Sequence, residues 1–204
     1  MSASGQETEA KFYVRDLSRI RSRLDELGAR LIQERVFETN IRFDLPGSPL
    51  RAEGRVLRLR RDTDVRLTYK SASKNQGGVL SREEIEFTVQ DFEIARRFLE
   101  AIGYQKLVYY EKYRTTYALT EALIMLDELP YGNFVEIEGE TVASIRTIAS
   151  QLGLHWDHAI AASYSALFDR ARRNLNVSMQ DLSFSEFKNI KVLASDLGVD
   201  GADT

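Results

Sequence analysis

The stretch QETEAKFYV, residues Gln6–Val14, decides the fold class, because its side chains alternate in kind from one residue to the next. Charged side chains occupy every second position, at Glu7, Glu9 and Lys11. A period of two is typical of a β-strand, in which successive side chains point to opposite faces. Two acids and a base in a row on one face indicate either a solvated sheet surface or the wall of a site for a highly charged ligand.

A strand–helix–strand unit is present twice in the sequence. Asp16 is a good helix N-cap, and the amphipathic segment that it precedes ends at Gly28. Asp91 and Gly103 bracket a second such segment, and each lies 75 residues after its counterpart. In the second segment one helix face is lined by Phe92, Ala95, Leu99 and Ile102. The strand-like stretches before the two segments, 6–14 and 81–89, keep the same offset. We therefore predict a duplicated unit, with a chance match between two amphipathic helices as the alternative.

The rest of the chain predicts hairpins first and helices later. Two hairpins are expected, with turns at Asp62–Asp64 and Pro130–Gly132, and a polar loop is expected over Ser71–Leu80. Helices are expected over Thr141–Gly153, Ala159–Asn174 and Asp181–Gly198. The predicted fold class is α+β. About eight strands, mostly antiparallel, would close into a barrel or tunnel with helices packed outside, built from two β-α-β-type halves.

The composition narrows the function classes. The chain has 204 residues, 43% of them apolar, and a net charge of −3, which argues against a nucleic-acid-binding surface. There is no Cys and there are two His, so a bound metal would be held mainly by carboxylates, which favours Mg²⁺ or Mn²⁺. No apolar run approaches the roughly 20 residues that span a bilayer. Residues 1–10 lack the features of a signal peptide, so we expect a cytoplasmic protein.

Same-sign charged pairs recur at alternate positions of the predicted strands. Examples are Arg58 with Arg60, Glu84 with Glu86, Lys112 with Arg114, and Glu136 with Glu138. One interpretation is that all these faces meet water, as is common in antiparallel sheets. However, like charges two residues apart repel unless a counter-charge lies between them. If the helices cover the apolar faces from outside, the charged faces point inward. Such an interior must hold water, metal ions and a polyanion, and a triphosphate with Mg²⁺ would use both the acids and the bases.

These residues resemble the CYTH domain, also called the triphosphate tunnel metalloenzyme superfamily. Glu7–Lys11 matches its signature ExExK, and similar stretches follow in order along the chain as far as residue 169. YEKYR, LPYGNFVEIEG and SYSALF are most similar to the class IV adenylyl cyclase branch. The resemblance implies a closed eight-stranded tunnel that binds divalent ions and a triphosphate. It also implies a tunnel domain over residues 1–173, followed by a helical extension and tail over residues 174–204.

The resemblance also implies a role for each charged position. The expected metal ligands are Glu7, Glu9, Glu136 and Glu138, with Asp127 assisting. The phosphates would be held by Lys11, Arg58, Arg60, Lys70, Lys112 and Arg114. Of these, the residues expected to take part in catalysis are Lys11, Arg58, Lys70 and Arg114. Other residues expected in the tunnel lining are Glu84, Glu86 and Arg42, with Ser163 and Tyr164 as candidates for its mouth.

Three functions remain open, and the resemblance favours the first. In a class IV adenylyl cyclase, the 3′-hydroxyl of ATP attacks the α-phosphorus, giving cAMP and pyrophosphate. In a triphosphatase, water attacks the terminal phosphorus of inorganic triphosphate, thiamine triphosphate or a nucleoside triphosphate. A non-catalytic module would only bind nucleotides or polyphosphate. Thr39–Asp44 lacks the Tyr that would pair with a tunnel Lys in the thiamine triphosphatase type, although hydrolysis by another arrangement stays open. The expected partner is a small triphosphate, without nucleic acid or membrane, and a homodimer is plausible.

Overall fold

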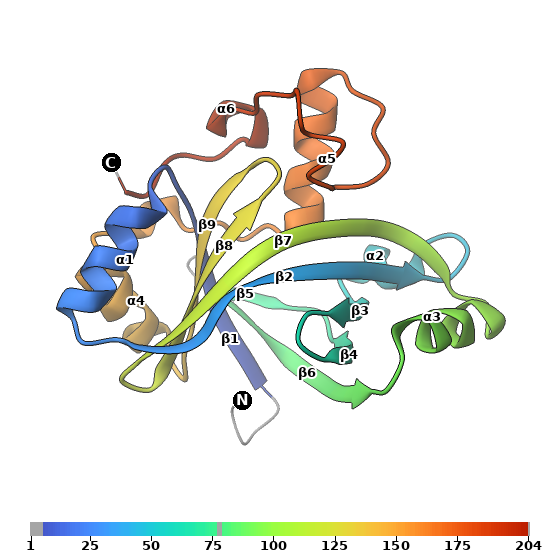
Figure 1. Cartoon of the computed structure of the whole chain (residues 1–204), viewed down its shortest axis with the longest axis horizontal. Coiled ribbons are helices and arrows are strands. Elements are labelled where there is room, and N and C mark those ends of the chain that lie inside the picture. Colours follow the sequence, from blue (N-terminus) through green and yellow to red (C-terminus); the bar gives the residue numbers. More distant parts are fainter. Residues whose placement is uncertain (1–5, 77–78, 204) are drawn as a thin grey trace.

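Eight antiparallel strands close into a ring, which is not evenly round its axis and carries the helices outside (Figure 1). The computed structural model describes residues 6–76 and 79–203. The strands are β1 (Gln6–Val14), β2 (Arg30–Asp44), β3 (Val56–Arg61), β4 (Val65–Lys70), β5 (Lys74–Gln76), β6 (Val79–Val89), β7 (Gln105–Leu119), β8 (Ala122–Leu129) and β9 (Gly132–Glu138). The ring runs β1-β9-β8-β7-β2-β3-β4-β6 and returns to β1, and the short β5 pairs only with β6. The predicted closed barrel is confirmed.

The helices follow the strands closely in sequence. They are α1 (Leu17–Glu26), α2 (Pro49–Ala52), α3 (Phe92–Ala101), α4 (Val142–Gln151), a 3-10 turn η1 (Trp156–His158), α5 (Tyr164–Leu175) and α6 (Ala194–Leu197). The predicted N-caps are confirmed, because the Asp16 carboxylate accepts from Ser18 N and the Asp91 carboxylate accepts from Ile94 N. No helix within residues 6–76 and 79–203 is both long enough and apolar enough to cross a membrane.

The duplicated unit explains how the ring closes. The first copy, β1-α1-β2, meets the second copy, β6-α3-β7, through antiparallel pairing of β1 with β6 and of β2 with β7. The two predicted hairpins connect the copies in the ring, β3 with β4 and β8 with β9. The 75-residue repeat in the sequence is therefore a repeat of the same structural unit, and each copy contributes one strand to the β1–β6 pair and one to the β2–β7 pair.

Helix packing places the apolar strand faces outside and the charged faces inside. Phe12 and Ile137 on the outer face of β1 and β9 pack in one core with Ile20 and Leu24 of α1 and Ile145 of α4. A second core joins α3 to the outer face of β2 and β3 through Ile41, Leu59 and Leu99. In Figure 1, α1 with α4 and α3 lie at opposite ends of the barrel. The inward orientation of the charged faces follows from this burial.

The helices do not cover every apolar position, contrary to expectation. Ile85 and Phe87 on the outer face of β6 are 53% and 55% exposed. Ile102, which we placed on the core-facing side of the second helix, is 54% exposed, because it is the C-cap residue and the helix has already turned away from the strands. The core contacts of α3 come from Phe92, Ala95 and Leu99 only.

Two of the predicted C-terminal helix boundaries are wrong. Helix α5 begins at Tyr164 and not at Ala159, because Ile160 N donates to Lys11 O of β1 at 2.8 Å and holds the preceding segment extended. The helix expected over Asp181–Gly198 is reduced to α6. Leu182 instead forms a β-bridge with Tyr110. Leu182 N donates to Tyr109 O at 2.9 Å, and Glu111 N donates to Leu182 O at 2.9 Å. This part of β7 has a free edge, because the pairing of β7 with β8 covers only Tyr113–Leu119.

The chain beyond α5 packs on the barrel. Ala202 N donates to Tyr13 O at 2.9 Å, and the Asp203 carboxylate accepts from the backbone N–H groups of Arg15 and Asp16. Helix α5 crosses the expected domain boundary at residue 173, and that boundary stays a prediction. The expected loop over Ser71–Leu80 contains the short β5, because its residues pair with the start of β6. Gly77 and Gly78 of that loop lie outside the described residues.

Candidate active site

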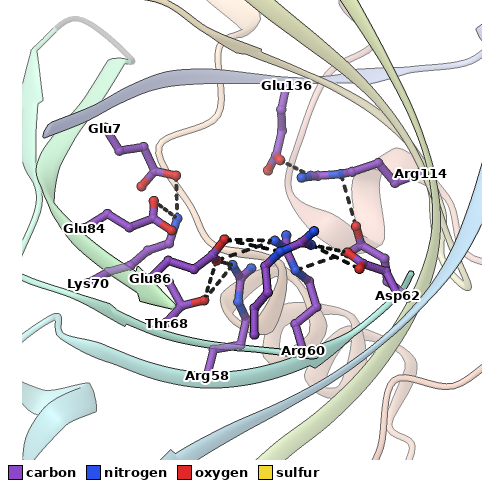
Figure 2. Close-up of polar contacts among 12 residues, drawn as sticks. Glu7, Arg58, Arg60, Asp62, Thr68, Lys70, Glu84, Glu86, Arg114 and Glu136 are labelled. Carbon is purple, nitrogen blue, oxygen red and sulfur yellow. Dashed lines mark hydrogen bonds and ion pairs between the residues drawn. The ribbon is translucent and has the colours of Figure 1, made fainter. Parts of the chain in front are cut away.

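A cavity of about 260 Å³ lies inside the ring of strands, and charged side chains form most of its lining. Figure 2 shows several of them converging from separate strands, among them Glu7, Lys70 and Glu136. All but one of the charged residues expected inside the tunnel line this cavity: Glu7, Glu9, Lys11, Arg42, Arg58, Arg60, Lys70, Glu84, Glu86, Lys112, Arg114, Glu136 and Glu138. Their position inside the barrel is established, and their individual roles stay predictions.

The strand register brings the ionic groups together. Glu9 pairs across the ladder with Glu138, and Lys11 pairs with Glu136. On the same inner face, Lys11 Nζ lies 3.1 Å from Glu136 Oε1, and the ion pair is buried. Burial alone would lower the pKa of Lys11, but Glu136 and Glu9 raise it above its ordinary value, so the ammonium stays charged.

The basic side of the cavity is built mainly from β2, β3 and β7. Arg60 Nη2 lies 3.3 Å from Glu86 Oε1, whereas Arg58 Nη2 is 3.8 Å from Glu86 Oε2 and 3.5 Å from Thr68 Oγ1 (Figure 2). Arg58 therefore has no carboxylate closer than 3.8 Å among the described residues, and its hydrogen bond with the Tyr110 side chain is its main fixed contact. Burial lowers the pKa of Arg58, but Tyr110 and Glu84 outweigh it and the net direction is upward. A charged guanidinium with weak partners is suited to receive a phosphate.

The acidic side lies on β1, β6 and β9. Burial, together with the neighbouring carboxylates of Glu7, Glu84 and Glu9, raises the pKa of Glu138 to about 7, although Lys70 acts in the opposite direction. Glu7 differs, because although burial raises its pKa, Lys70 and Arg82 bring it down to about 2. Lys70 Nζ also lies 3.1 Å from Glu84. The acids on this side thus outnumber the cations that could neutralise Glu138.

This crowding fits a divalent cation in its donor chemistry. Carboxylate oxygens are the ligands that Mg²⁺ and Mn²⁺ prefer, and a cation here would relieve the repulsion that raises the pKa of Glu138. Within residues 6–76 and 79–203, no three acidic or His side chains already converge in the geometry of a metal site. Ion pairs with Lys70 and Arg82 hold Glu7 apart from such a cluster. Binding of a cation would therefore require these side chains to exchange partners.

Asp127 occupies the wall of the barrel and does not line the cavity. It is 0% exposed, and its carboxylate accepts from Lys112 Nζ at 2.9 Å, from Arg114 Nε and Nη2 at 2.6 Å, and from Tyr164 Oη at 2.8 Å. Every lone pair that a metal would need is thus occupied by a donor. Its expected part in metal binding stays a prediction, and the geometry favours a role in positioning Arg114 and Lys112.

Several lining residues were not anticipated as part of the tunnel. Arg82 and Tyr110 line the cavity, together with Ser165 of α5. The signal for the first two was present, because Arg82 precedes Glu84 and Tyr110 precedes Lys112 at alternate positions of the same strands. Glu38, two inner positions before Arg42, was missed as well and lies buried 3.5 Å from Lys112 Nζ. Ser163 and Tyr164 line the cavity as anticipated.

Glu38 predicts how stability depends on pH. Burial raises its pKa, but Lys112 and Arg114 reduce it from the ordinary 4.5 to about 2. The unfolded chain therefore binds this proton more readily, so the stabilisation is complete above the unfolded pKa and is lost as pH falls towards the folded one. Between about pH 5 and pH 3 we expect the wild type to lose about 2 kcal/mol more unfolding free energy than Glu38→Gln. Urea unfolding at several pH values measures this, and parallel pH curves for the two proteins would contradict it.

The fold and cavity define a class: a closed antiparallel β-tunnel with helices outside and an ionic interior. The CYTH domain family model matches residues 5–146, and the chain belongs to this family. A Methanocaldococcus jannaschii protein provisionally named an adenylate cyclase is 25% identical over 172 residues, covering 79% of this chain and 97% of that protein.

Solved structures show the same fold. A Vibrio parahaemolyticus protein, also provisionally named an adenylate cyclase, aligns with a TM-score of 0.71 and 20% identity over 80% of this chain and 97% of its own. A Hippeastrum protein described as having a dominant triphosphatase activity aligns with a TM-score of 0.59 and 21% identity, over 85% of this chain and 97% of its own. The family includes adenylyl cyclase-like and triphosphatase enzymes and implies the use of a divalent metal.

Proposed function

We propose that this protein hydrolyses the terminal phosphate of a triphosphate bound inside the barrel, with Mg²⁺ or Mn²⁺ as cofactor. The observation that carries the proposal is one cavity inside the ring of strands with a mainly basic side and a mainly acidic side (Figure 2). The phosphates of a triphosphate pair with Arg and Lys, and the cation that accompanies them binds carboxylates. A ligand that is only an anion, or only a cation, would pair with only one of these two sides of the cavity.

The mechanism consists mainly of positioning and charge neutralisation. Arg58, Arg60 and Lys112 would hold the phosphate chain and neutralise the charge that develops on the leaving pyrophosphate. Lys11 and Arg114 keep their charge beside Glu136, which fixes their position at the wall. A divalent cation held by Glu7, Glu9 and Glu138 would lower the pKa of the attacking water and shield the phosphates. The ring of strands limits access of bulk water, which strengthens these interactions.

The size of the cavity favours hydrolysis over cyclisation. Its volume of about 260 Å³ is below the roughly 300–1,000 Å³ of pockets that enclose a drug-sized ligand. Hydrolysis needs only the triphosphate group inside, whereas cyclisation also needs the ribose at the reacting phosphorus. The Hippeastrum protein, described as having a dominant triphosphatase activity, also favours hydrolysis over cyclisation.

Cyclisation of ATP is the second candidate, supported by the provisional adenylate cyclase names of the Methanocaldococcus and Vibrio relatives. In that reaction the same cations would hold the β- and γ-phosphates as the leaving group. A module that binds nucleotides or polyphosphate without reaction is the third. The homodimer and the cytoplasmic location stay predictions.

Product analysis separates the three functions. The protein is incubated with tripolyphosphate and with ATP, each with Mg²⁺ or Mn²⁺, and phosphate, pyrophosphate, ADP and cAMP are separated. We expect phosphate and pyrophosphate from tripolyphosphate, and loss of both when a chelator removes the metal. Predominant formation of cAMP from ATP would establish the second candidate instead, and binding without product would establish the third.

A further inference from the structure

Arg42 differs from the other cations of the cavity. It lies on the inner face of β2, opposite Arg58 of β3 in the strand register, and it lines the cavity. In the described part of the chain, every other lining cation forms an ion pair with a carboxylate: Lys11, Arg58, Arg60, Lys70, Arg82, Lys112 and Arg114. Arg42 forms none there. A mostly buried guanidinium without a counter-charge is costly, so this position calls for an anion from outside the chain.

The hydrogen bonds of Arg42 leave part of its guanidinium unpaired. Its Nη1 donates to Ser165 Oγ at the start of α5, while its buried Nε has no hydrogen-bond partner among the described residues. The edge that carries Nε and Nη2 is the one with which Arg binds two oxygens of a phosphate. Burial lowers the pKa of Arg42, as do Arg51, Arg58 and Arg82, whereas Tyr110 raises it. The local potential is therefore strongly positive.

A second group on the same face of β2 has unmet hydrogen-bonding capacity. Asn40 is 0% exposed, and neither its Nδ2 nor its Oδ1 has a partner in the part of the chain that the structure describes. In the strand register it lies between Arg60 and Tyr110, one inner position from Arg42. Buried amides are normally hydrogen-bonded, because leaving one unpaired costs about 1–3 kcal/mol. Asn40 does not itself line the cavity, so of these two neighbouring residues of β2 only Arg42 is placed to meet a bound oxyanion.

The first turn of α5 borders the same part of the cavity. Ser163, Tyr164 and Ser165 all line it, and the Ser163 side chain caps the helix by accepting from Ala166 N. The 12-residue helix therefore directs its N-terminal end, with its partial positive charge, towards the space beside Arg42. This adds to the field of Arg42. Ser165 Oγ accepts from Arg42 Nη1, lies 3.0 Å from Ser163 Oγ and lines the cavity beside Arg42.

We propose that Arg42 and Ser165 form a subsite for the phosphate at one end of the bound triphosphate chain, next to the phosphate that Arg58 holds. The subsite rests on the proposed function in one respect, because it takes the ligand to be a triphosphate. It gives the substrate a direction, with one end at the α5 side of the tunnel. It also lets the protein distinguish chain lengths. A tripolyphosphate can occupy this subsite, the site of Arg58 and the site beyond it at the same time, whereas a pyrophosphate fills only two of the three and can bind without the Arg42 subsite.

A purely structural role for Arg42 is the competing explanation, since its bond to Ser165 also ties α5 to β2. The chain offers a matched control. Arg51 of α2 contacts Asp169, one turn further along α5, but this ion pair lies at the surface and Arg51 does not line the cavity. If Arg42 only anchors α5, Arg42→Gln and Arg51→Gln should have similar consequences. If it binds phosphate, only the former should weaken triphosphate binding.

Calorimetric titration with tripolyphosphate and with pyrophosphate, in the absence of divalent ions so that no hydrolysis occurs, tests the subsite. We expect Arg42→Gln to weaken tripolyphosphate binding about ten-fold or more, because a hydrogen-bonded charge is lost. Pyrophosphate binding should change much less, so the preference for the longer chain narrows. Ser165→Ala should likewise reduce the ratio of tripolyphosphate affinity to pyrophosphate affinity. Arg51→Gln should leave both affinities unchanged. Arg42→Lys keeps the charge without the planar fork, so it should bind tripolyphosphate between the wild type and Arg42→Gln even if the latter folds poorly.

The outcomes separate this inference from the proposed function. If the wild type binds and hydrolyses tripolyphosphate but Arg42→Gln and Arg42→Lys bind it equally well, the subsite is wrong and the function stands. An equal loss of affinity in Arg42→Gln and Arg51→Gln would likewise overturn the subsite in favour of anchoring. If the wild type binds neither anion, the proposed function fails first, and the subsite fails with it.

Discussion

Arg58→Gln is expected to lower kcat/KM for tripolyphosphate hydrolysis by about 10²–10³-fold, because it removes one preorganised charge from the point where negative charge develops. Arg58 lies on the inner face of β3 and its nearest acidic partner, Glu86, is 3.8 Å away. Its guanidinium lines the cavity and, apart from its hydrogen bond with Tyr110, has no close protein acceptor among the described residues. The loss should occur without a comparable loss of stability, because the ion pair that it breaks is weak. Steady-state kinetics together with a thermal melt measures both quantities.

Arg66→Gln is the matched control for this substitution. Arg66 lies on the neighbouring strand β4, and its Nε is also 3.8 Å from Glu86, but its other partners are Asp62 and Asp64 and it does not line the cavity. Its removal should leave kcat/KM nearly unchanged. Equal losses in the two variants would mean that Glu86, and not phosphate binding by Arg58, is responsible. An unaffected Arg58→Gln enzyme would remove the basic side of the cavity from the mechanism.

Asp127→Asn is expected to lower the unfolding free energy by about 3–5 kcal/mol, because it removes the acid from a buried ionic network and leaves its cations uncompensated. Lys112 and Arg114 both depend on this carboxylate, and Lys112 is almost completely buried. Glu38 is more distant, at 3.5 Å from Lys112 and 3.8 Å from Arg114, and Glu136, which contacts Arg114, is shared with Lys11. Urea unfolding with a linear extrapolation measures the change.

Glu128→Gln provides the comparison on the opposite face of the same strand. Glu128 follows Asp127 directly, and its carboxylate pairs with Arg35 at 2.9 Å and Arg21 at 3.5 Å near the surface. Such exposed pairs contribute at most about 1 kcal/mol, so this substitution should be mild. If Asp127 were instead a metal ligand, Asp127→Asn would weaken Mn²⁺ binding and cost little stability. A small stability change in both variants would contradict the buried network.

Local patterns were enough to predict most of the fold. The caps Asp16 and Asp91, the hairpin turn at Asp62–Asp64 and the alternation in β1 all depend on residues close in sequence, so they can be recognised without a structure. The C-terminal errors have a different origin. A helix was expected over Asp181–Gly198, but at Leu182 the free edge of β7 offers the backbone hydrogen-bond partners that no local pattern reveals.

The candidate site, too, was predictable from local patterns only in part. Period-two alternation placed Glu9, Arg58 and Lys112 on inner faces, because alternation follows from the geometry of a single strand. It could not say which acid neutralises which base. Asp127 shares its strand with apolar residues and looks like one more tunnel acid in sequence, yet its partners Lys112 and Arg114 come from the adjacent strand and hold it in the wall.

The sequence by itself determined a duplicated strand–helix–strand barrel with an ionic lining, because charge alternation, helix caps and turns act over a few residues. Only the tertiary structure decided which charges are satisfied within the chain. Glu136 meets both Lys11 and Arg114, whereas Arg42 meets no acid among the described residues. Such pairing depends on the register between strands that are far apart in sequence. The electrostatic energy changes most steeply at short separations, so a small difference in register separates a neutralised cation from one that meets no acid among the described residues.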